Sequence, residues 1–363
     1  MSDPRNSPSL SSPEKVLRVV QWAPGKVGSS SMRAIIRHPD MELVGVYVYS
    51  KEKAGKDAGE LCGLDPVGVL STRNIEDIIA LKPDCVLYMP QFTDVDDVCS
   101  LLAAGINIVT TRSDFFFPAM MDSELYERVE GACREGAASI HGTGISPGFI
   151  TEAFPLAITS VSRQLNGLLI DEYANITDSC SDELIFGFMG YGKPNDGKVD
   201  QMMLDYTCKG FGSSLALTAS ALGLPIDSIE SLGETAAARS RVQTPNGGVI
   251  EPGTIGALRI TVTAKKNNRP LIKFRANWYC TLDIEEGWQL QDSGWRIQVD
   301  SDAPFDISIR LPETAEPFAE RMAGYTAHRA VNAVPYVCAA EPGIRSSTDL
   351  PPVVAQLGKA TTI

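Results

Sequence analysis

Short apolar segments alternate with amphipathic ones through the first 150 residues of the chain. Near-continuous apolar runs predict strands over residues 16–23, 41–50, 83–90, 106–111 and 138–145. Between them, apolar positions spaced three or four apart predict helices over residues 29–38, 74–81, 95–105 and 121–136. Strands that are apolar on both faces and alternate with helices are typical of a parallel sheet covered on both sides. The pattern therefore predicts an α/β protein whose residues 15–150 form a Rossmann-type domain.

After about residue 150 the pattern changes. Helical periodicity continues over residues 151–165 and 198–223, but long alternating runs follow over 256–284 and 294–311, with a turn at 265–270. Alternation predicts strands with one buried face, so residues 151–312 are expected to form an α+β substrate and dimerisation domain with an open, mainly antiparallel sheet.

Both ends of the chain have their own character. The helix predicted over residues 314–339 and the tail behind it, together residues 313–363, are expected to return to the first domain. Residues 1–14 are polar and rich in Ser and Pro, lack the apolar core of a signal peptide, and predict a disordered tail.

Composition excludes several classes of protein. A formal net charge of −13 over 363 residues argues against a nucleic-acid partner, and the absence of an apolar run of about 18 residues argues against a membrane span. The eight cysteines are scattered without a CxxC pair, which favours a reducing, cytoplasmic location. The three histidines form no HExxH motif, so no metal site is expected.

The first strand leads into a glycine-containing turn and a helix, as in a dinucleotide-binding unit. Trp22 stands where the first glycine of that motif is expected and Pro24 where the second is, while Gly25 and Gly28 remain. Free amides at a helix start bind phosphate, so the predicted cofactor cradle consists of Ala23, Pro24, Gly25, Lys26, Val27 and Gly28. A glycine turn that binds nothing is the alternative.

The end of the second strand distinguishes the two nicotinamide cofactors. Enzymes that use NAD carry a carboxylate there, whereas this chain has Ser50 and Lys51, followed by Lys53 and Lys56. Hydroxyl and ammonium donors suit a 2′-phosphate, so NADP is favoured, with NAD as the alternative cofactor. A solvated lysine loop is the other interpretation.

Three further loops follow strands and should meet at the same sheet edge, because ligands of open α/β sheets bind at the carboxyl ends of strands. The residues predicted there to contact the cofactor are Met89, Pro90, Thr110, Thr111, Arg112, Ser146 and Pro147. Arg112 binds an anion, pairs with Asp114 or faces solvent. Phe149, Tyr173 and Asn175 are candidates for the substrate pocket wall, with ordinary packing as their alternative role.

Four segments together carry a family resemblance: residues 19–28, 50–63, 106–118 and 141–149. With them the chain resembles the dihydrodipicolinate reductase-like superfamily, in its 2,4-diaminopentanoate dehydrogenase and native amine dehydrogenase branch. The resemblance implies an NAD(P)-binding Rossmann domain, a sheet-rich domain that closes the substrate pocket, and a homodimer built on that sheet. It also implies hydride transfer between a nicotinamide and an imine carbon, which interconverts an amine with a carbonyl compound and ammonia.

In that branch a Glu on the loop after the fourth strand handles protons and stabilises the iminium charge. Asp114 is the carboxylate on this loop and takes the role, although the family's Glu aligns with either Asp114 or Ser113. Capping of the following turn is the alternative role of Asp114.

Two other functions remain open. One is reduction of a cyclic imine or carbonyl compound without ammonia, and the other is non-catalytic sensing of NADP. The chain lacks the His-His-Lys substrate motif of the true dihydrodipicolinate reductases, so that activity is not expected.

Overall fold

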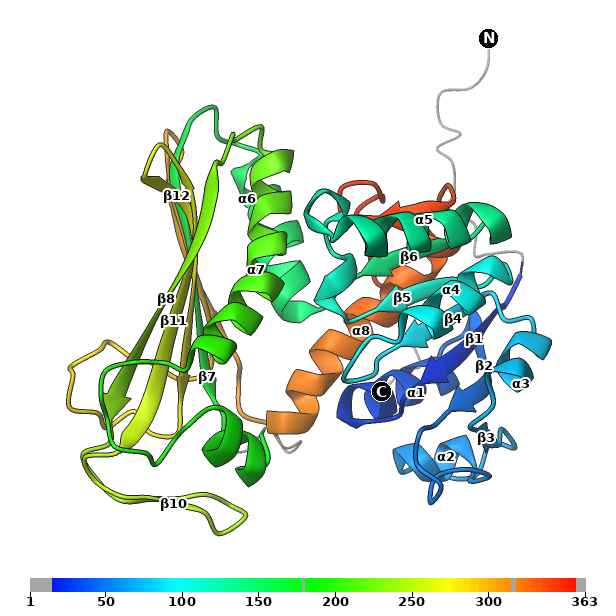
Figure 1. Ribbon diagram of the computed structural model, residues 1–363, viewed down its shortest axis with the longest axis horizontal. Coiled ribbons are helices and arrows are strands. Elements are labelled where there is room, and N and C mark those ends of the chain that lie inside the picture. Colours follow the sequence, from blue (N-terminus) through cyan, green and yellow to red (C-terminus); the bar gives the residue numbers. More distant parts are fainter. Residues whose placement is uncertain (1–14, 178–179, 315–317, 357–363) are drawn as a thin grey trace.

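The computed structural model describes residues 15–177, 180–314 and 318–356. The tail predicted over residues 1–14 and the last residues from 357 lie outside the described residues. Two lobes lie side by side, one built on a parallel sheet with helices on both faces and one on a long open sheet (Figure 1). The predicted α/β fold with a second, sheet-rich domain is confirmed.

The first sheet has seven strands in the order β15-β6-β5-β4-β1-β2-β3, and all its neighbouring pairs are parallel. Its strands are β1 (Leu17–Trp22), β2 (Met41–Tyr47), β3 (Ser71–Thr72), β4 (Cys85–Tyr88), β5 (Asn107–Thr110), β6 (Ser139–Gly142) and β15 (Gly343–Arg345). Five were predicted. The other two, β3 and β15, are edge strands of two and three residues, which are too short to show a hydrophobic period.

Five α-helices accompany these strands: α1 (Lys26–Ile36), α2 (Ala58–Cys62), α3 (Ile75–Ala80), α4 (Val95–Ala103) and α5 (Ser123–Gly136). Two single turns, η1 (Ser113–Phe115) and η2 (Pro118–Met120), follow β5. Helix α1 begins three residues before the predicted start at Ser29, because Gly25 is its N-cap and accepts from the Ser29 amide at 2.7 Å. Lys26, Val27 and Gly28 therefore form the first helical turn rather than a loop.

The second sheet has six strands in the order β14-β13-β7-β12-β11-β8, and only β7 and β12 pair in parallel. Its strands are β7 (Leu165–Asn175), β8 (Ser228–Ala237), β11 (Ile255–Lys266), β12 (Arg269–Tyr279), β13 (Gly294–Ser301) and β14 (Phe305–Arg310). A small ribbon consists of β9 (Val242–Gln243) and β10 (Val249–Ile250). The hairpin between β11 and β12 turns at Asn267 and Asn268, both with positive φ, where the turn was predicted.

The remaining helical segments connect and cover the two domains. They are η3 (Ile145–Ala153), α6 (Phe154–Thr159), η4 (Glu183–Phe188), α7 (Gln201–Ala221) and α8 (Phe318–Cys338). The single helix expected over residues 151–165 is wrong. It ends at Thr159 because Asp302 Oδ1 accepts from the amides of Arg163 and Gln164, which removes them from a helix and starts β7.

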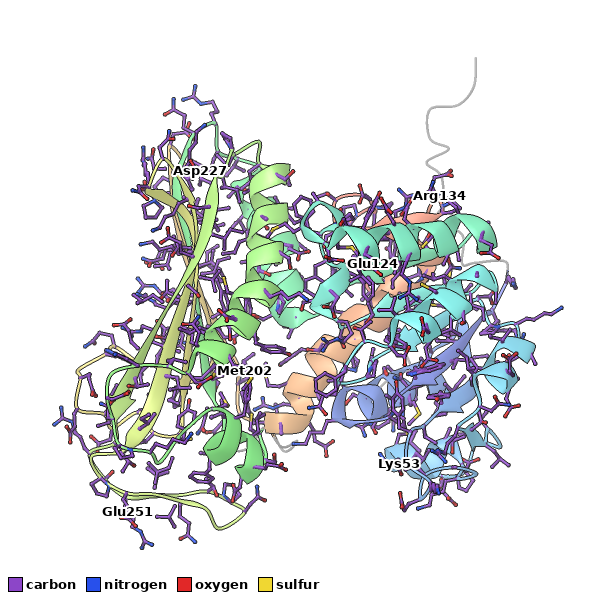
Figure 2. The ribbon with its side chains drawn as sticks, viewed as in Figure 1. Lys53, Glu124, Arg134, Met202, Asp227 and Glu251 are labelled. Carbon is purple, nitrogen blue, oxygen red and sulfur yellow. The ribbon has the colours of Figure 1, made fainter. Side chains whose placement is uncertain are left out.

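Helix α7 covers the face of the second sheet that looks toward the first domain (Figures 1 and 2). Phe211 of α7 stacks on Phe274 of β12 with ring centroids 3.8 Å apart, in one core cluster with Ile170 and Leu215. The opposite face of this sheet carries side chains but no helix among the described residues. Helix α8 crosses back and packs against α1, so the chain's last helix lies in the first domain.

Three classes of feature are absent from the described residues. None of their helices is both long and apolar enough to cross a membrane. The eight cysteines, all within the described ranges, form no disulfide. No group of three or more His, Cys, Asp or Glu in these ranges is placed to hold a metal ion.

The start of α1 packs against the end of β1 so closely that Gly28 has no room for a side chain. A Cβ there would overlap Ala23 O and lie 2.9 Å from Gln21 Nε2. Gly28→Ala is therefore expected to lower the free energy of unfolding by about 1–3 kcal/mol in thermal or urea unfolding. Gly25→Ala is the matched control, because its φ is −80° and nothing lies within 4 Å of its Cβ position. Equal losses in the two variants would contradict this close-packing argument.

Candidate cofactor and active site

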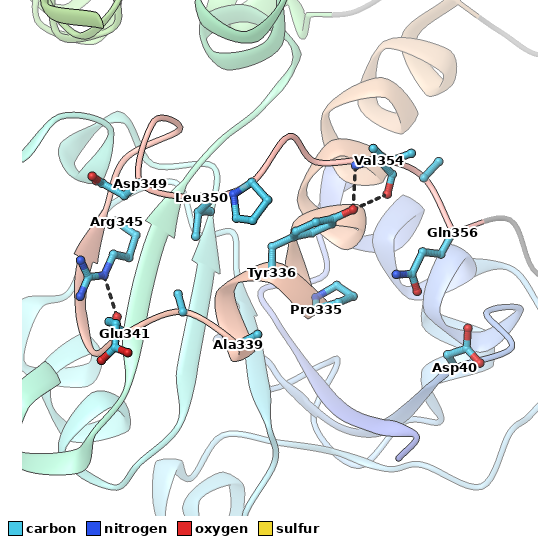
Figure 3. A pocket seen from close by; sticks show the side chains of 13 residues that line it. Asp40, Pro335, Tyr336, Ala339, Glu341, Arg345, Asp349, Leu350, Val354 and Gln356 are labelled. Atoms are coloured by element: carbon cyan, nitrogen blue, oxygen red, sulfur yellow. Dashed lines mark hydrogen bonds between the residues drawn. The ribbon is translucent and has the colours of Figure 1, made fainter. Parts of the chain in front are cut away.

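A cavity of about 700 Å³ lies away from the predicted site. It lies under the segment that follows β15, where Tyr336 of α8 bonds the backbone of Val354 (Figure 3). Asp40 and Glu341, which line it, precede β2 and β15. This cavity therefore opens at the amino ends of the strands, whereas ligands of open α/β sheets bind at the carboxyl ends.

The turn after β1 has one left-handed residue, Ala23, with a φ of 62°. The one residue of this turn whose backbone conformation favours glycine is therefore Ala23, and not Trp22 or Pro24, where the motif has its glycines. The Ala23 amide donates to Tyr47 O at 2.9 Å, and Gly25 N donates back to Ala23 O at 2.9 Å. These bonds close the turn without the two missing glycines.

Trp22 does not block the turn, because its side chain points into the domain core. The ring is fully buried, stacks on Tyr47 with centroids 3.7 Å apart, and lies 5.6 Å from the ring of Tyr88. Its indole N–H donates to Tyr49 Oη at 2.9 Å. Tyr49 itself is 48% exposed at the end of β2, so Trp22 is connected to the surface on which an adenosine would lie.

The N-terminus of α1 faces the second domain across a cavity of about 470 Å³. Amides in the first turn of a helix lack intrahelical acceptors, and the helix dipole makes this end positive. The lining comes from α1, the segments after β7 and β9, and the start of α8: Lys26, Thr177, Cys180, Ser181, Pro245, Asn246, Phe318 and Ala319. A positive helix end that opens into a cavity between the domains fits the pyrophosphate of a dinucleotide.

Two cations join the predicted pair Ser50 and Lys51 at the end of β2. Lys53 Nζ donates to Pro24 O at 3.1 Å, which places its ammonium group beside the phosphate turn. Arg73, which follows β3, donates from Nε to Tyr49 O at 2.9 Å. The sequence analysis missed Arg73, because its proximity to Ser50 comes from the β2–β3 pairing rather than from sequence distance.

The predicted cofactor residues of β4 and β5 lie side by side at the carboxyl edge. Met89 and Pro90 are buried, and Met89 Sδ lies 3.7 Å from Ser31 Oγ of α1. Thr110 is buried and donates to Tyr88 O at 2.7 Å, so its hydroxyl supports the sheet edge. Thr111 is half-buried beside it.

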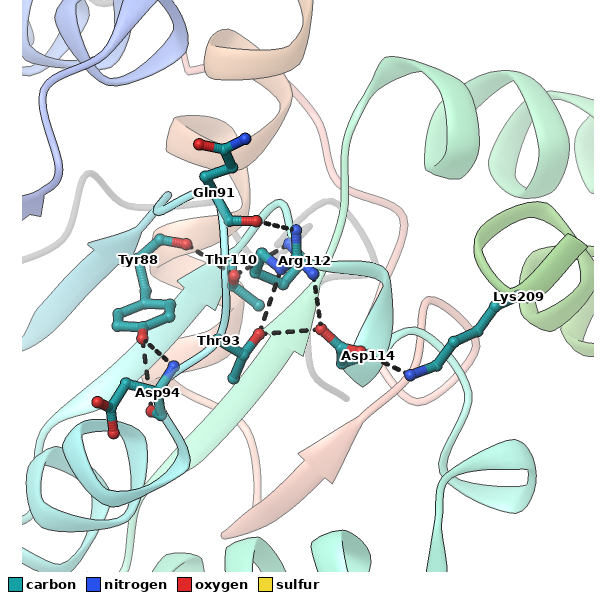
Figure 4. Close-up of polar contacts among 8 residues, drawn as sticks. All are labelled: Tyr88, Gln91, Thr93, Asp94, Thr110, Arg112, Asp114 and Lys209. Carbon is teal, nitrogen blue, oxygen red and sulfur yellow. Dashed lines mark hydrogen bonds and ion pairs between the residues drawn. The ribbon is translucent and has the colours of Figure 1, made fainter. Parts of the chain in front are cut away.

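Asp114 lies in η1, directly after that edge, and is held by three donors from three segments (Figure 4). Thr93 Oγ1 donates to its Oδ2 at 2.9 Å, and Arg112 Nη2 lies 3.1 Å from the same oxygen. Lys209 of α7 reaches Oδ1 at 3.2 Å from the second domain. Arg112 therefore pairs with Asp114, which is one of the three roles predicted for it.

Opposing influences set the pKa of Asp114. Burial of the carboxyl is the largest and raises it, but the Thr93 hydrogen bond and the charges of Arg112 and Lys209 together outweigh burial. The pKa of Asp114 therefore lies below its ordinary value, and the side chain is a carboxylate at neutral pH. An ionised carboxylate suits stabilisation of a cation.

Strand β6 and the segment after it contain buried polar atoms with no partner among the described residues. They are His141 Nε2, Thr143 Oγ1 and Ser146 Oγ, and Ser146 and Pro147 are both predicted cofactor residues. Buried polar groups in proteins are normally hydrogen-bonded, so these unpaired atoms mark a place that suits a ligand or ordered water. This is a second feature that fits a cofactor, here at the nicotinamide end.

Glu152 is a functional candidate that the sequence analysis missed. It is 1% exposed and joins three segments: it lies in η3 and accepts from Ser214 Oγ of α7 at 2.7 Å and from Ser347 Oγ behind β15. Burial raises the pKa of Glu152 to about 7, against the lowering effects of both hydroxyls and of Arg329. Nothing in the local sequence TEAFP distinguishes this Glu from an exposed one.

The predicted pocket-wall residues are not brought together. Phe149 is half-buried under the Arg329 guanidinium, whose carbon lies 5.7 Å from the ring centroid. Tyr173 points to the face of the second sheet opposite Ile170 and α7, and packs with Tyr279, so the structure places it away from the cleft. The reason is register, because successive side chains alternate between faces.

Asn175 ends β7, and its Oδ1 accepts from the amide and hydroxyl of Thr177 at 3.0 and 2.7 Å. Thr177 lines the cavity at the start of α1. Asn175 therefore supports the wall of that cavity through Thr177, rather than forming the wall itself.

Both domains of the chain are similar to known families. Residues 19–110 match the family described as dihydrodipicolinate reductase, N-terminus, and residues 201–363 match the 2,4-diaminopentanoate dehydrogenase C-terminal domain. An amine dehydrogenase of Streptomyces virginiae is 25% identical over 360 residues, covering 95% of this chain and 99% of that one.

Two solved structures share the fold. The amine dehydrogenase from Mycobacterium smegmatis has a TM-score of 0.74 at 18% identity, covering 94% of this chain and 98% of that one. GenD2 from gentamicin A biosynthesis, in complex with NAD, has a TM-score of 0.50 at 14% identity, covering 88% of this chain and 86% of that one.

The raised pKa of Glu152 makes stability depend on pH. The folded state favours the protonated form of Glu152. Its contribution to the free energy of unfolding is therefore complete below pH 4.5, the pKa in the unfolded chain, and is lost as the pH rises to about 7. Glu152→Gln cannot ionise and does not lose this contribution. The free energy of unfolding of the variant minus that of the parent should therefore increase by about 3 kcal/mol between these two pH values. Chemical unfolding at a series of pH values measures the difference.

Two comparisons isolate this effect. Burial lowers the pKa of His141 to about 4, so its contribution is lost as the pH falls from 6.5, but this slope is common to both proteins and cancels. Glu127→Gln, an exposed change of the same charge on α5, should give no pH-dependent difference. A flat difference for Glu152→Gln as well would show that Glu152 is not held protonated.

Proposed function

This chain belongs to the dihydrodipicolinate reductase-like superfamily, and on that premise we propose that it is an NADP-preferring amine dehydrogenase. It would move hydride between the nicotinamide and the carbon of an imine. In one direction a small amine gives a carbonyl compound and ammonia, and in the other a ketone or aldehyde is reductively aminated. The observation that carries this proposal is Asp114, a carboxylate on the loop after β5, where the amine dehydrogenase branch has its Glu.

The first domain supplies the proposed cofactor site. The first turn of α1 would bind the pyrophosphate, and Ser50 and Lys51, with Lys53 and Arg73 beside them, would bind the 2′-phosphate. The hydroxyls of Thr143 and Ser146, which have no partner in the described part of the chain, suit the carboxamide of the nicotinamide.

The chemistry needs a hydride donor and a group that manages charge and protons. The bound nicotinamide supplies or accepts the hydride. The Asp114 carboxylate then has two tasks: it holds the ammonium or iminium nitrogen near the cleft, and it exchanges protons with that nitrogen and with water while the imine forms. Thr93 and Arg112 orient it through Oδ2, which leaves Oδ1 toward the second domain.

One observation favours a second candidate, a reductase of a cyclic imine or carbonyl compound without ammonia. Asp114 already carries two cationic partners, Arg112 and Lys209, and its pKa lies below the ordinary value, which weakens it as a base. Such a carboxylate can stabilise charge but is a poor acceptor of protons at neutral pH. The two candidates differ in their dependence on ammonium.

A homodimer built on the six-stranded sheet and a cytoplasmic location are part of the proposal. The uncovered face of that sheet carries paired charges at its centre, where Arg275 holds Asp171 of the neighbouring strand. A second copy would have to match this polar surface.

Asp114→Ala is expected to lower turnover by about a hundredfold or more, because it removes the proton-handling group. NADPH binding should be unchanged, since Asp114 lies beyond the phosphate sites. The assay is NADPH absorbance with a panel of small ketones and aldehydes, with and without ammonium chloride, together with a fluorescence titration of NADPH. Asp96→Asn, whose side chain is 85% exposed on α4, is the control.

The outcomes separate the functions. Turnover that requires ammonium and is lost in Asp114→Ala supports the amine dehydrogenase. Turnover that needs no ammonium supports the reductase. NADPH binding without any turnover supports a nucleotide sensor. Unchanged turnover in Asp114→Ala removes the residue from the mechanism.

Replacing Ser50 by Asp and Lys51 by Ala should shift binding from NADPH toward NADH. A charged hydrogen bond contributes about 1.5–3 kcal/mol, so the Kd for NADPH should rise roughly ten- to a hundredfold. Lys56→Ala removes a charge from the same loop at an exposed position and serves as the control. An unaltered ratio of the two Kd values would place the 2′-phosphate elsewhere, with Arg73→Ala as the next variant to measure.

A further inference from the structure

The two oxygens of Asp114 have different surroundings. Oδ2 is held by Thr93 Oγ1 at 2.9 Å and Arg112 Nη2 at 3.1 Å, both from the first domain. Oδ1 has one hydrogen-bond partner within the described ranges, Lys209 Nζ at 3.2 Å, which comes from the second domain (Figure 4). One oxygen is therefore fixed from within its own domain, and the other is held across the domain boundary.

The partners of Oδ2 are themselves fixed. Arg112 donates from Nη1 to Gln91 O at 2.7 Å and from Nε to Thr93 Oγ1 at 3.2 Å, and its side chain is 17% exposed. The guanidinium thus has bonds on both sides and cannot leave Oδ2 without breaking several of them. Exchange at this oxygen is disfavoured.

The partner of Oδ1 is exposed to solvent by comparison. The Lys209 side chain is 75% exposed, while that of Asp114 is 14% exposed. The backbone of Lys209 lies close to η1. A Cβ on the next residue, Gly210, would be 3.5 Å from Ser113 Oγ. The backbone of Lys209 is therefore held beside the carboxylate, while its ammonium group ends a long, flexible and exposed side chain.

We propose that Lys209 occupies, on Asp114 Oδ1, the place of the substrate's ammonium group and leaves it when a primary amine or ammonium ion binds. This inference rests on the proposed function, in which Asp114 holds the reacting nitrogen. Lys209 ends in a primary alkylammonium, which is the same chemical group as a protonated amine substrate. The ligand class is thus a primary ammonium compound, and the lysine is an internal competitor for its subsite.

Charge makes exchange more favourable than addition. Arg112 and Lys209 already place two positive charges on one negative carboxylate, so a third cation added at Oδ1 would be repelled at close range. If one ammonium replaces the other, the local charge is unchanged and no covalent bond is made or broken. While no amine occupies the subsite, the Lys209 ammonium is the hydrogen-bond donor to Oδ1.

The experiment measures binding rather than turnover. The NADP⁺-loaded protein is titrated calorimetrically with cyclohexylammonium chloride, with sodium chloride holding the ionic strength constant. Lys209→Met removes the competitor while keeping its length, and an exposed ion pair is weak, so the Kd should fall about two- to fivefold. Lys209→Arg keeps a competing cation and should show no such fall. Lys198→Met, an exposed lysine ahead of α7, controls for the loss of one charge.

A lower Kd in Lys209→Met alone, together with loss of binding in Asp114→Asn, supports the exchange. An equal or higher Kd in Lys209→Met, the same fall in Lys198→Met, or no binding by any variant overturns it. Turnover is measured on the same preparations. Tighter binding in Lys209→Met without turnover would support the ammonium exchange and contradict the dehydrogenase function. Amine turnover with an unchanged Kd would support the dehydrogenase function and contradict the exchange.

Discussion

The hydrogen bonds of one buried carboxyl group join three segments at the boundary between the two domains. Glu152 lies on the segment that leaves the first sheet, and it is held by Ser214 of α7 and by Ser347 behind the edge strand β15. Removing a buried polar partner leaves the others unsatisfied, which costs more than the bond itself. Helix α7 also carries Lys209, so the same helix that bonds Glu152 brings an ammonium group to Asp114.

The same arrangement sets the electrostatics of the candidate site. Asp114 is partly buried, yet hydrogen bonds and cations from both domains keep it ionised. Glu152 is fully buried, its hydrogen-bond donors among the described residues are the hydroxyls of Ser214 and Ser347, and burial raises its pKa. Two carboxyl groups close to the domain boundary are thus driven in opposite directions by their surroundings, as the balance of desolvation against charge requires.

Much of the fold could be predicted from the sequence, because the signals were local. The five longer parallel strands and the turn at Asn267 follow from apolar runs and turn residues within single segments. Errors arose where a distant residue decided the outcome. Asp302 ends the helix expected over residues 151–165, and sheet register turns Tyr173 away from α7. Arg73 joins the end of β2 only through the pairing with β3.

By itself the sequence determined the order of the five longer parallel strands, the glycine turn at the start of α1, and the presence of one carboxylate after β5, since each is a property of neighbouring residues. Only the tertiary structure decided that Ala23 takes the left-handed conformation, that Lys209 meets Asp114, and that Glu152 is buried. The reason is physical: charge and hydrogen bonding act between atoms that are close in space, and in these cases the partners lie on different segments of the chain.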